Sequence, residues 1–67
     1  MIQFTKINED IILINPDLIE FVEFIPESKI NMNNGKYHVV SETKEEIMEK
    51  VVEYRKKIVN IAIREES

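Results

Sequence analysis

Residues 43–64 contain neither glycine nor proline, and their apolar side chains recur every three or four positions. This period places the apolar side chains on one face of an α-helix. Thr43 and Glu46 have the spacing of a capping box, so the helix is predicted to begin at Thr43. Its main apolar stripe consists of Ile47, Val51, Tyr54, Ile58 and Ile61, and a second stripe beside it consists of Met48, Val52, Val59 and Ala62.

The length of this helix limits how the rest of the chain can cover it. A helix that follows the Thr43 cap and ends near Arg64 is about 31 Å long, whereas strands of five or six residues span only ~17–20 Å. We therefore expect the end of the helix to extend beyond the sheet. An apolar overhang needs a partner, so self-association is predicted through Ile58, Val59, Ile61 and Ala62.

The size of the chain favours the same conclusion. The sequence has 67 residues and no cysteine. A chain this small forms a marginal core and is usually stabilised by disulfides, a metal or oligomerisation. Disulfides are excluded and a single histidine cannot build a histidine-rich metal site, which leaves a homo-oligomer as the expected form.

The first 42 residues alternate between short apolar runs and polar turns, which predicts strands at 2–7, 11–14 and 19–25. The run at 11–14 is apolar at every position and is typical of a strand covered on both faces. Asn15-Pro16-Asp17 and Pro26-Glu27-Ser28 are predicted turns. Phe4, Phe21 and Phe24 are expected core residues. Alternatively, because Phe21 and Phe24 lie three apart in a strand and point to opposite faces, one of them faces away from the core.

Asn34-Gly35 is the preferred dipeptide for a two-residue type I′ hairpin, because both positions require a positive φ. This loop predicts that Met32 pairs with Tyr37 and Ile30 pairs with Val39 on one face. His38 then lies opposite Asn31 on the outer face.

These elements predict one α+β domain over residues 1–67. Residues 1–42 form a small antiparallel sheet of four to five short strands, and residues 43–64 form one long amphipathic helix. An open sheet and a closed, barrel-like sheet both fit this pattern.

The charge of the chain restricts its partners. A net charge of −4 and a pI near 4.9 argue against nucleic acid, which requires a clustered cationic surface. The acidity also gives no attraction to anionic membranes. No apolar stretch is long enough to span a bilayer and no signal peptide is recognisable, so a cytoplasmic protein without direct membrane insertion is expected.

Candidate catalytic groups are few. His38 is the only general base of the usual kind, and no serine or cysteine nucleophile is arranged with it. The lone glycine excludes a glycine-rich phosphate loop, and the spacing of Asp17, Glu20 and Glu23 does not match a calcium loop. We therefore expect a non-enzyme without a cofactor or metal.

The charges on the helix suggest only surface interactions. Glu46–Lys50 and Glu53–Lys57 have the spacing of i,i+4 ion pairs. Arg55 belongs to a short basic cluster, for which a solvated face and an anionic docking site are the two interpretations.

Several motifs together resemble the small flagellar FlbD family, also called SwrD. The most specific are Asn15-Pro16-Asp17-Leu18-Ile19-Glu20 and Asn34-Gly35-Lys36, and the similarity also includes Ile2-Gln3-Phe4-Thr5-Lys6-Ile7-Asn8 and Ile25-Pro26-Glu27-Ser28. Two positions depart from the family pattern, since Glu9 replaces a common glycine and Pro26-Glu27-Ser28 replaces a typical Pro-Asp-Thr.

The resemblance implies an accessory protein of bacterial flagella that supports swarming motility and motor power. It implies an interaction, such as one with the stator units at the cytoplasmic side of the motor, and no established catalytic residue. The candidate partner contacts are Asn15, Pro16, Asp17, Asn34, Gly35 and Arg55, although turn chemistry alone also explains the first five. The alternatives are a structural or assembly oligomer of the basal body and a small regulatory module that binds a ligand or nucleic acid.

Overall fold

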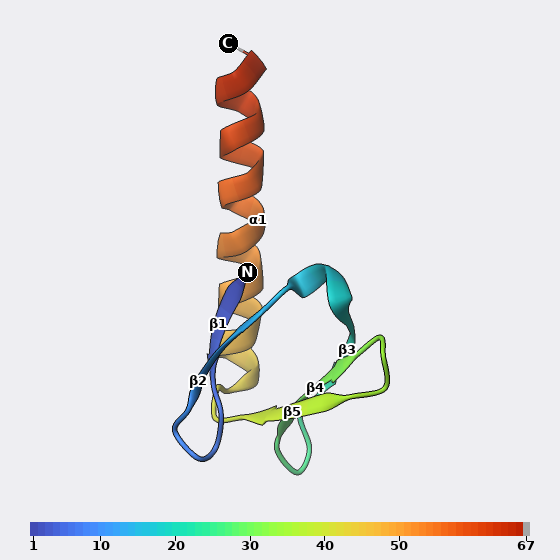
Figure 1. The fold of residues 1–67 in the computed structure, drawn as a ribbon. Helices are drawn as coiled ribbons and strands as arrows, with labels where there is room; N and C mark the ends of the chain where they lie inside the picture. The colour runs from blue at the N-terminus through green and yellow to red at the C-terminus, as the bar shows by residue number, and fades with distance from the viewer. Residues whose placement is uncertain (67) are drawn as a thin grey trace.

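The computed structural model describes the backbone of residues 1–66 and the side chains of residues 1–57. All the strands precede the long helix (Figure 1), which confirms the α+β class. The elements are β1 (Ile2–Thr5), β2 (Ile11–Ile14), the 3₁₀-helix η1 (Pro16–Leu18), β3 (Ile19–Glu23), β4 (Ser28–Met32), β5 (Tyr37–Val40) and α1 (Lys44–Glu66).

The strands form two antiparallel sheets. One contains β1 and β2, and the other has the order β3-β4-β5. A single bridge between Lys6 and Val40 joins the two sheets, together with a hydrogen bond from the Ser41 amide to the Thr5 carbonyl at 2.8 Å. Within residues 1–66 no strand pairing closes the gap between β2 and β3, so the sheets are open and do not form a barrel.

The core lies where the two sheets meet the start of α1. Phe4 and Ile30 are fully buried, which confirms the prediction for Phe4. Phe24 packs against this core while Phe21 is exposed, so the prediction that Phe21 is a core residue is wrong and the alternative, that the two point to opposite faces, holds. The buried hydrophobic residues are Ile2, Phe4, Ile14, Ile30, Val40 and Ile47.

The turn between β1 and β2 is a three-residue loop in which one residue has left-handed backbone geometry. Lys6 donates its amide to the Asp10 carbonyl at 2.8 Å, and the Glu9 amide donates to the Lys6 carbonyl at 2.9 Å. Glu9 has a φ of 74°. The combination is typical of a type I turn followed by a left-handed residue.

The turn between β4 and β5 has the same hydrogen bonds, so the predicted two-residue loop is wrong. Met32 donates to the Lys36 carbonyl and accepts from the Gly35 amide. Gly35 has a φ of 86°, and Asn34 does not have a positive φ. A type I′ turn needs a positive φ at both positions, and the three-residue loop needs it only at Gly35.

The longer loop shifts the pairing of the hairpin by one residue. Ile30 pairs with His38, and Asn31 pairs with Tyr37, which contradicts the predicted Met32–Tyr37 and Ile30–Val39 pairs. A one-residue shift exchanges the faces of a strand. His38 is therefore half-buried on the core side, and Tyr37 lies on the outer face with its ring centroid 4.2 Å from Lys29 Nζ.

The predicted capping box begins α1. The Thr43 amide donates to Glu46 Oε1 at 3.0 Å, and the Glu46 amide donates to Thr43 Oγ1 at 3.2 Å. Ile47 is buried, and Val51 and Tyr54 pack against the core. The main apolar stripe of the helix therefore covers the sheets over its first three turns.

The helix extends far beyond the sheets (Figure 1), as its predicted length required. Its 23 residues give about 34 Å at 1.5 Å per residue, and the molecule measures 45 × 23 × 20 Å. The predicted self-association residues Ile58, Val59, Ile61 and Ala62 lie outside the described side chains.

The predicted ion pairs on the helix are wrong. Lys50 pairs with Glu42 at 3.4 Å rather than with Glu46, and Glu53 pairs with Lys56 at 3.7 Å rather than with Lys57. The Lys50 side chain turns toward β1, where a buried carboxylate offers a stronger partner than an exposed one.

Candidate functional site

The Asn15-Pro16-Asp17 turn begins η1, and the Asn15 side chain forms a hydrogen bond within the turn. Asn15 Oδ1 accepts a hydrogen bond from the Asp17 amide at 3.0 Å, and the Asn15 carbonyl accepts one from the Leu18 amide at 3.0 Å. Pro16 occupies the start of the 3₁₀-helix, where its fixed φ is favourable. Backbone geometry accounts for this motif, and a partner contact here stays a prediction.

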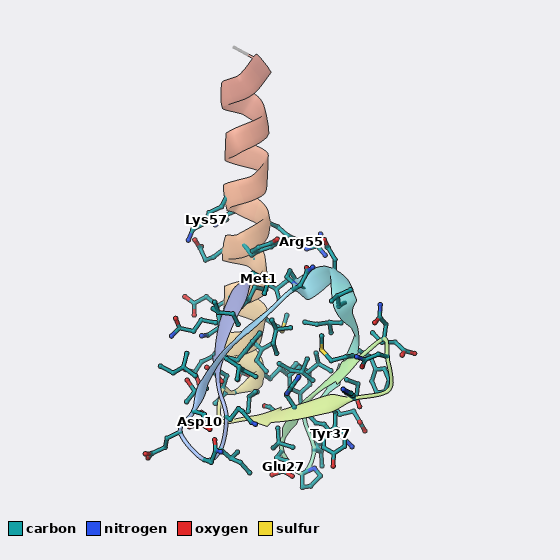
Figure 2. The ribbon with its side chains drawn as sticks, viewed as in Figure 1. Met1, Asp10, Glu27, Tyr37, Arg55 and Lys57 are labelled. Atoms are coloured by element: carbon teal, nitrogen blue, oxygen red, sulfur yellow. The ribbon has the colours of Figure 1, made fainter. Side chains whose placement is uncertain are left out.

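The Asn34-Gly35 turn lies beside η1, because the Asn33 amide donates to the Leu18 carbonyl at 2.8 Å. Asn34 Oδ1 in turn accepts from the Lys36 amide at 2.9 Å. The structure thus brings two of the predicted contact regions together. Arg55 is exposed on α1 (Figure 2), and among residues 1–57 no hydrogen bond or ion pair joins it to either turn.

The outer side of the β1–β2 hairpin exposes large aliphatic side chains. Ile11 is 64% exposed and Leu13 is 61% exposed, and Ile7 in the adjoining turn is similarly exposed. The prediction that residues 11–14 are covered on both faces is therefore wrong: Ile14 is buried in the core, and no element within residues 1–66 covers the opposite face. We refer to Ile7, Ile11 and Leu13 as the hairpin patch.

β2 is also the outermost strand of its sheet. In an antiparallel pair, alternate residues direct their amide and carbonyl groups away from the partner strand. Ile11 and Leu13 lie opposite Thr5 and Gln3, and Thr5 and Gln3 hydrogen-bond to groups on the far side of β1. The same alternation directs the backbone groups of Ile11 and Leu13 outward, where a further strand can pair with them.

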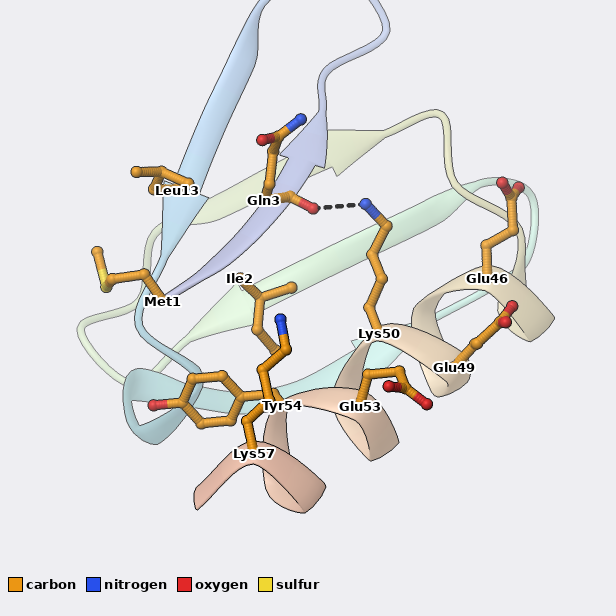
Figure 3. Close-up of a pocket in the computed structure, with 10 residues that line it drawn as sticks. All are labelled: Met1, Ile2, Gln3, Leu13, Glu46, Glu49, Lys50, Glu53, Tyr54 and Lys57. Carbon is orange, nitrogen blue, oxygen red and sulfur yellow. Dashed lines mark hydrogen bonds between the residues drawn. The ribbon is translucent and has the colours of Figure 1, made fainter. Parts of the chain in front are cut away.

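A groove of about 750 Å³ separates this hairpin from α1. Figure 3 shows Met1, Ile2 and Leu13 on the hairpin side and Tyr54 on the helix side, so the groove has apolar walls. Charged helix residues form its rim. The groove is continuous with the hairpin patch through Leu13. The rim residues are Glu46, Glu49, Lys50, Glu53 and Lys57.

A buried carboxylate and a lysine join β1 to the helix. Both oxygens of Glu42 accept from the Thr5 amide, at 3.0 and 2.9 Å. Lys50 Nζ lies 3.4 Å from Glu42 Oε2 and donates to the Gln3 carbonyl at 2.6 Å, the bond drawn in Figure 3. Glu42 is only 7% exposed. Within residues 1–57, the side chains of Glu42 and Lys50 thus hydrogen-bond to backbone groups of β1 at positions where no strand pairs with it.

Burial by itself raises the pKa of the Glu42 carboxyl, because a charge is less stable away from water. The amides of Thr5 and of Glu42 itself, together with the Lys50 ammonium, stabilise the ionised form and leave this pKa below its ordinary value. Glu42 is therefore ionised at neutral pH. Both oxygens of the Glu42 carboxylate bind groups of the protein itself, so this carboxylate stabilises the fold.

Sequence reasoning missed Glu42 and Lys50 as a pair. Glu42 and Thr5 are 37 positions apart, and no spacing rule relates them. The only local signal is an acidic residue directly before a helix cap, which is ordinarily a solvated position.

The side chains of residues 1–57 provide no cluster of three or more metal-ligating groups. His38 lies opposite Ile30 on the core side of its hairpin, away from the outer position predicted for it.

No helix in the described part of the chain has the length and hydrophobicity needed to cross a membrane. No curated protein and no solved structure shows a significant match to this sequence. A family model described as FlbD, flagellar and swarming motility proteins, matches residues 1–59. This match includes β1 to β5, the turns between them and the part of α1 that packs on the core. The chain belongs to the FlbD family of flagellar and swarming motility proteins.

Proposed function

We propose that this protein is a non-enzymatic accessory protein of the bacterial flagellum that supports the power delivered by the motor's stator units. It acts by binding another flagellar protein at the cytoplasmic side of the motor. The observation that carries the proposal is the hairpin patch, where aliphatic side chains and an unpaired strand edge occur together.

The patch has the properties of a binding surface for an extended segment. A partner strand beside β2 would pair with the backbone groups of Ile11 and Leu13 and cover their side chains. Burying a fully exposed aliphatic side chain contributes about 1.5–3 kcal/mol. Because Ile11 and Leu13 are about two-thirds exposed, each would contribute about 1–2 kcal/mol.

The polar groups support an interaction role rather than catalysis. Among residues 1–57, every buried side-chain nitrogen or oxygen has a hydrogen-bond partner. Glu42, the buried carboxylate, is bound by Thr5 and Lys50. These groups stabilise the fold and leave the exposed aliphatic surface as the distinctive chemical feature.

Threonine substitutions test the proposal, since threonine retains β-propensity while removing most of the apolar surface. We expect Ile11→Thr and Leu13→Thr to reduce swarming and the rotation speed of tethered cells. Ile25→Thr is the matched control, because Ile25 is 90% exposed and lies outside the hairpin patch. Cellular abundance and thermal unfolding of each purified variant establish that the fold is intact.

Counting flagella distinguishes motor support from assembly. Normal flagellar number with slow rotation in the patch variants supports the proposal. Fewer flagella would indicate a role in assembling the basal body instead. Patch variants that swarm and rotate like the Ile25→Thr control would refute the hairpin patch as the functional surface.

A further inference from the structure

The helix α1 carries an apolar surface that its own sheets do not cover. Met48 is 55% exposed and Val52 is 49% exposed. These residues are four positions apart and therefore adjacent on one face of the helix. The sequence continues their stripe with Val59 and Ala62, which lie beyond the described side chains.

Beyond Val52, the space beside the helix is open. Figure 1 shows the second half of α1 projecting from the body of the molecule, with no other element alongside it. A second helix can lie against this part of α1 without displacing a strand. We infer that two copies of this chain pair through their α1 helices in antiparallel orientation, along the face that carries Met48 and Val52.

The charges beside the stripe favour a second copy in this orientation. Glu49 and Lys56 are exposed on the same flank of the stripe, about two turns apart, and Lys56 also lies 3.7 Å from Glu53 of its own helix. Antiparallel pairing that sets Val52 against Arg55 of the second copy brings Glu49 of each copy within one turn of Lys56 of the other. Parallel pairing about a two-fold axis would place the flanks that carry Glu49 and Lys56 on opposite sides of the interface, where these residues gain no ion pair with each other.

The apolar residues and the charges have separate roles in this pairing. Exposed ion pairs contribute little to affinity, so Glu49 and Lys56 select the orientation while the stripe supplies the buried area. A two-fold axis uses the same surface on both copies, so one self-complementary stripe is sufficient. Arg55 is the one charged residue within the stripe and brings two positive charges near the axis.

This pairing goes beyond the proposed flagellar role and uses a surface separate from the hairpin patch. It also supplies the additional burial that a 67-residue chain without cysteine needs. It is tested on the purified full-length protein, with no flagellar partner present.

Two charge reversals test the inference. In the Lys56→Glu dimer, positions 49 and 56, which meet across the interface, are both acidic. In the Glu49→Lys dimer, both positions are basic. We expect each variant alone to dimerise roughly tenfold more weakly than the wild type in sedimentation equilibrium. An equimolar mixture of the two should recover wild-type affinity, because every contact in the mixed dimer joins opposite charges.

Recovery in the mixture shows that both variants are folded and that weakening comes from the charges. Arg55→Leu should dimerise several-fold more tightly, since it removes the charge near the axis. A wild-type protein that sediments as an 8 kDa monomer at high micromolar concentration would overturn the inference. Single reversals that dimerise as well as the wild type would overturn the antiparallel arrangement.

Discussion

Glu9 occupies a backbone conformation that favours glycine, so Glu9→Gly is expected to stabilise the protein. The φ of Glu9 is 74°, and the equivalent residue of the β4–β5 turn is Gly35 with a φ of 86°. The two turns also share an asparagine that caps the loop: Asn8 Oδ1 accepts from the Asp10 amide, as Asn34 Oδ1 accepts from the Lys36 amide. One turn therefore has the favoured residue and the other does not.

The size of the effect follows from two opposing contributions. A residue with a Cβ loses about 1–2 kcal/mol in the left-handed region, and glycine removes this cost. Glycine also increases the conformational entropy of the unfolded chain, and this effect reduces the stabilisation by about 0.4–1 kcal/mol. The side chain of Glu9 makes no hydrogen bond or ion pair with the described residues. The net stabilisation is about 0.5–1 kcal/mol, or roughly 2–8 °C in Tm for a domain this small.

Thermal unfolding followed by circular dichroism measures this change, at one fixed protein concentration because dimerisation also stabilises. Glu27→Gly is the matched control, since Glu27 is an exposed loop glutamate without a positive φ. Glycine there should lower Tm. Gly35→Ala should also lower Tm: a Cβ at Gly35 meets no atom within 4 Å, so the cost comes from the backbone alone. A Tm for Glu9→Gly at or below that of the wild type would refute this reasoning.

Three further substitutions test the core, the buried ion pair and the histidine. Phe4→Ala should cost about 3–5 kcal/mol, because Phe4 is fully buried at the centre of the core, and urea titration should find the variant largely unfolded. The lowered pKa of Glu42 stabilises the native state above the ordinary pKa of glutamate. That stability is lost as the pH falls through the pKa that Glu42 has in the folded protein. Glu42→Gln should therefore reduce the free energy of unfolding at pH 7 by about 1–3 kcal/mol. The same substitution should make Tm depend less on pH in the acid range. His38→Gln should leave swarming near the wild-type level, since no proton transfer is assigned to His38; loss of swarming at normal abundance would contradict this.

The elements that depend on neighbouring residues could be predicted from the sequence. The capping box of Thr43 and Glu46, the turn at Pro16 and the apolar stripe of α1 all involve residues within a few positions of one another. Their hydrogen bonds and packing faces follow from local geometry. The excess length of the helix over the sheets could be predicted for the same reason.

The register of the β4–β5 hairpin could not be predicted from its turn sequence alone. Asn34-Gly35 fits both a two-residue and a three-residue loop, since Gly35 accepts a positive φ in either. The two loops differ by one residue in register, and this difference exchanges the faces of His38 and Tyr37. Ile30 lies on the core face in both registers, and the observed register is the one that also places Val40 in the core.

The candidate site was decided by tertiary structure. An apolar run at residues 11–14 is consistent with a buried strand, and it becomes an exposed patch because β2 lies at the edge of its sheet. Likewise, Glu42 would be an ordinary surface acid if β5 extended further along β1. Instead, Thr5 and Gln3 present unpaired backbone groups, and Glu42 and Lys50 satisfy them across 37 and 47 positions of sequence. Local residue types thus determine where strands, turns and the helix begin and end, whereas exposure and pairing depend on which strands become neighbours, a choice made by packing across the whole chain.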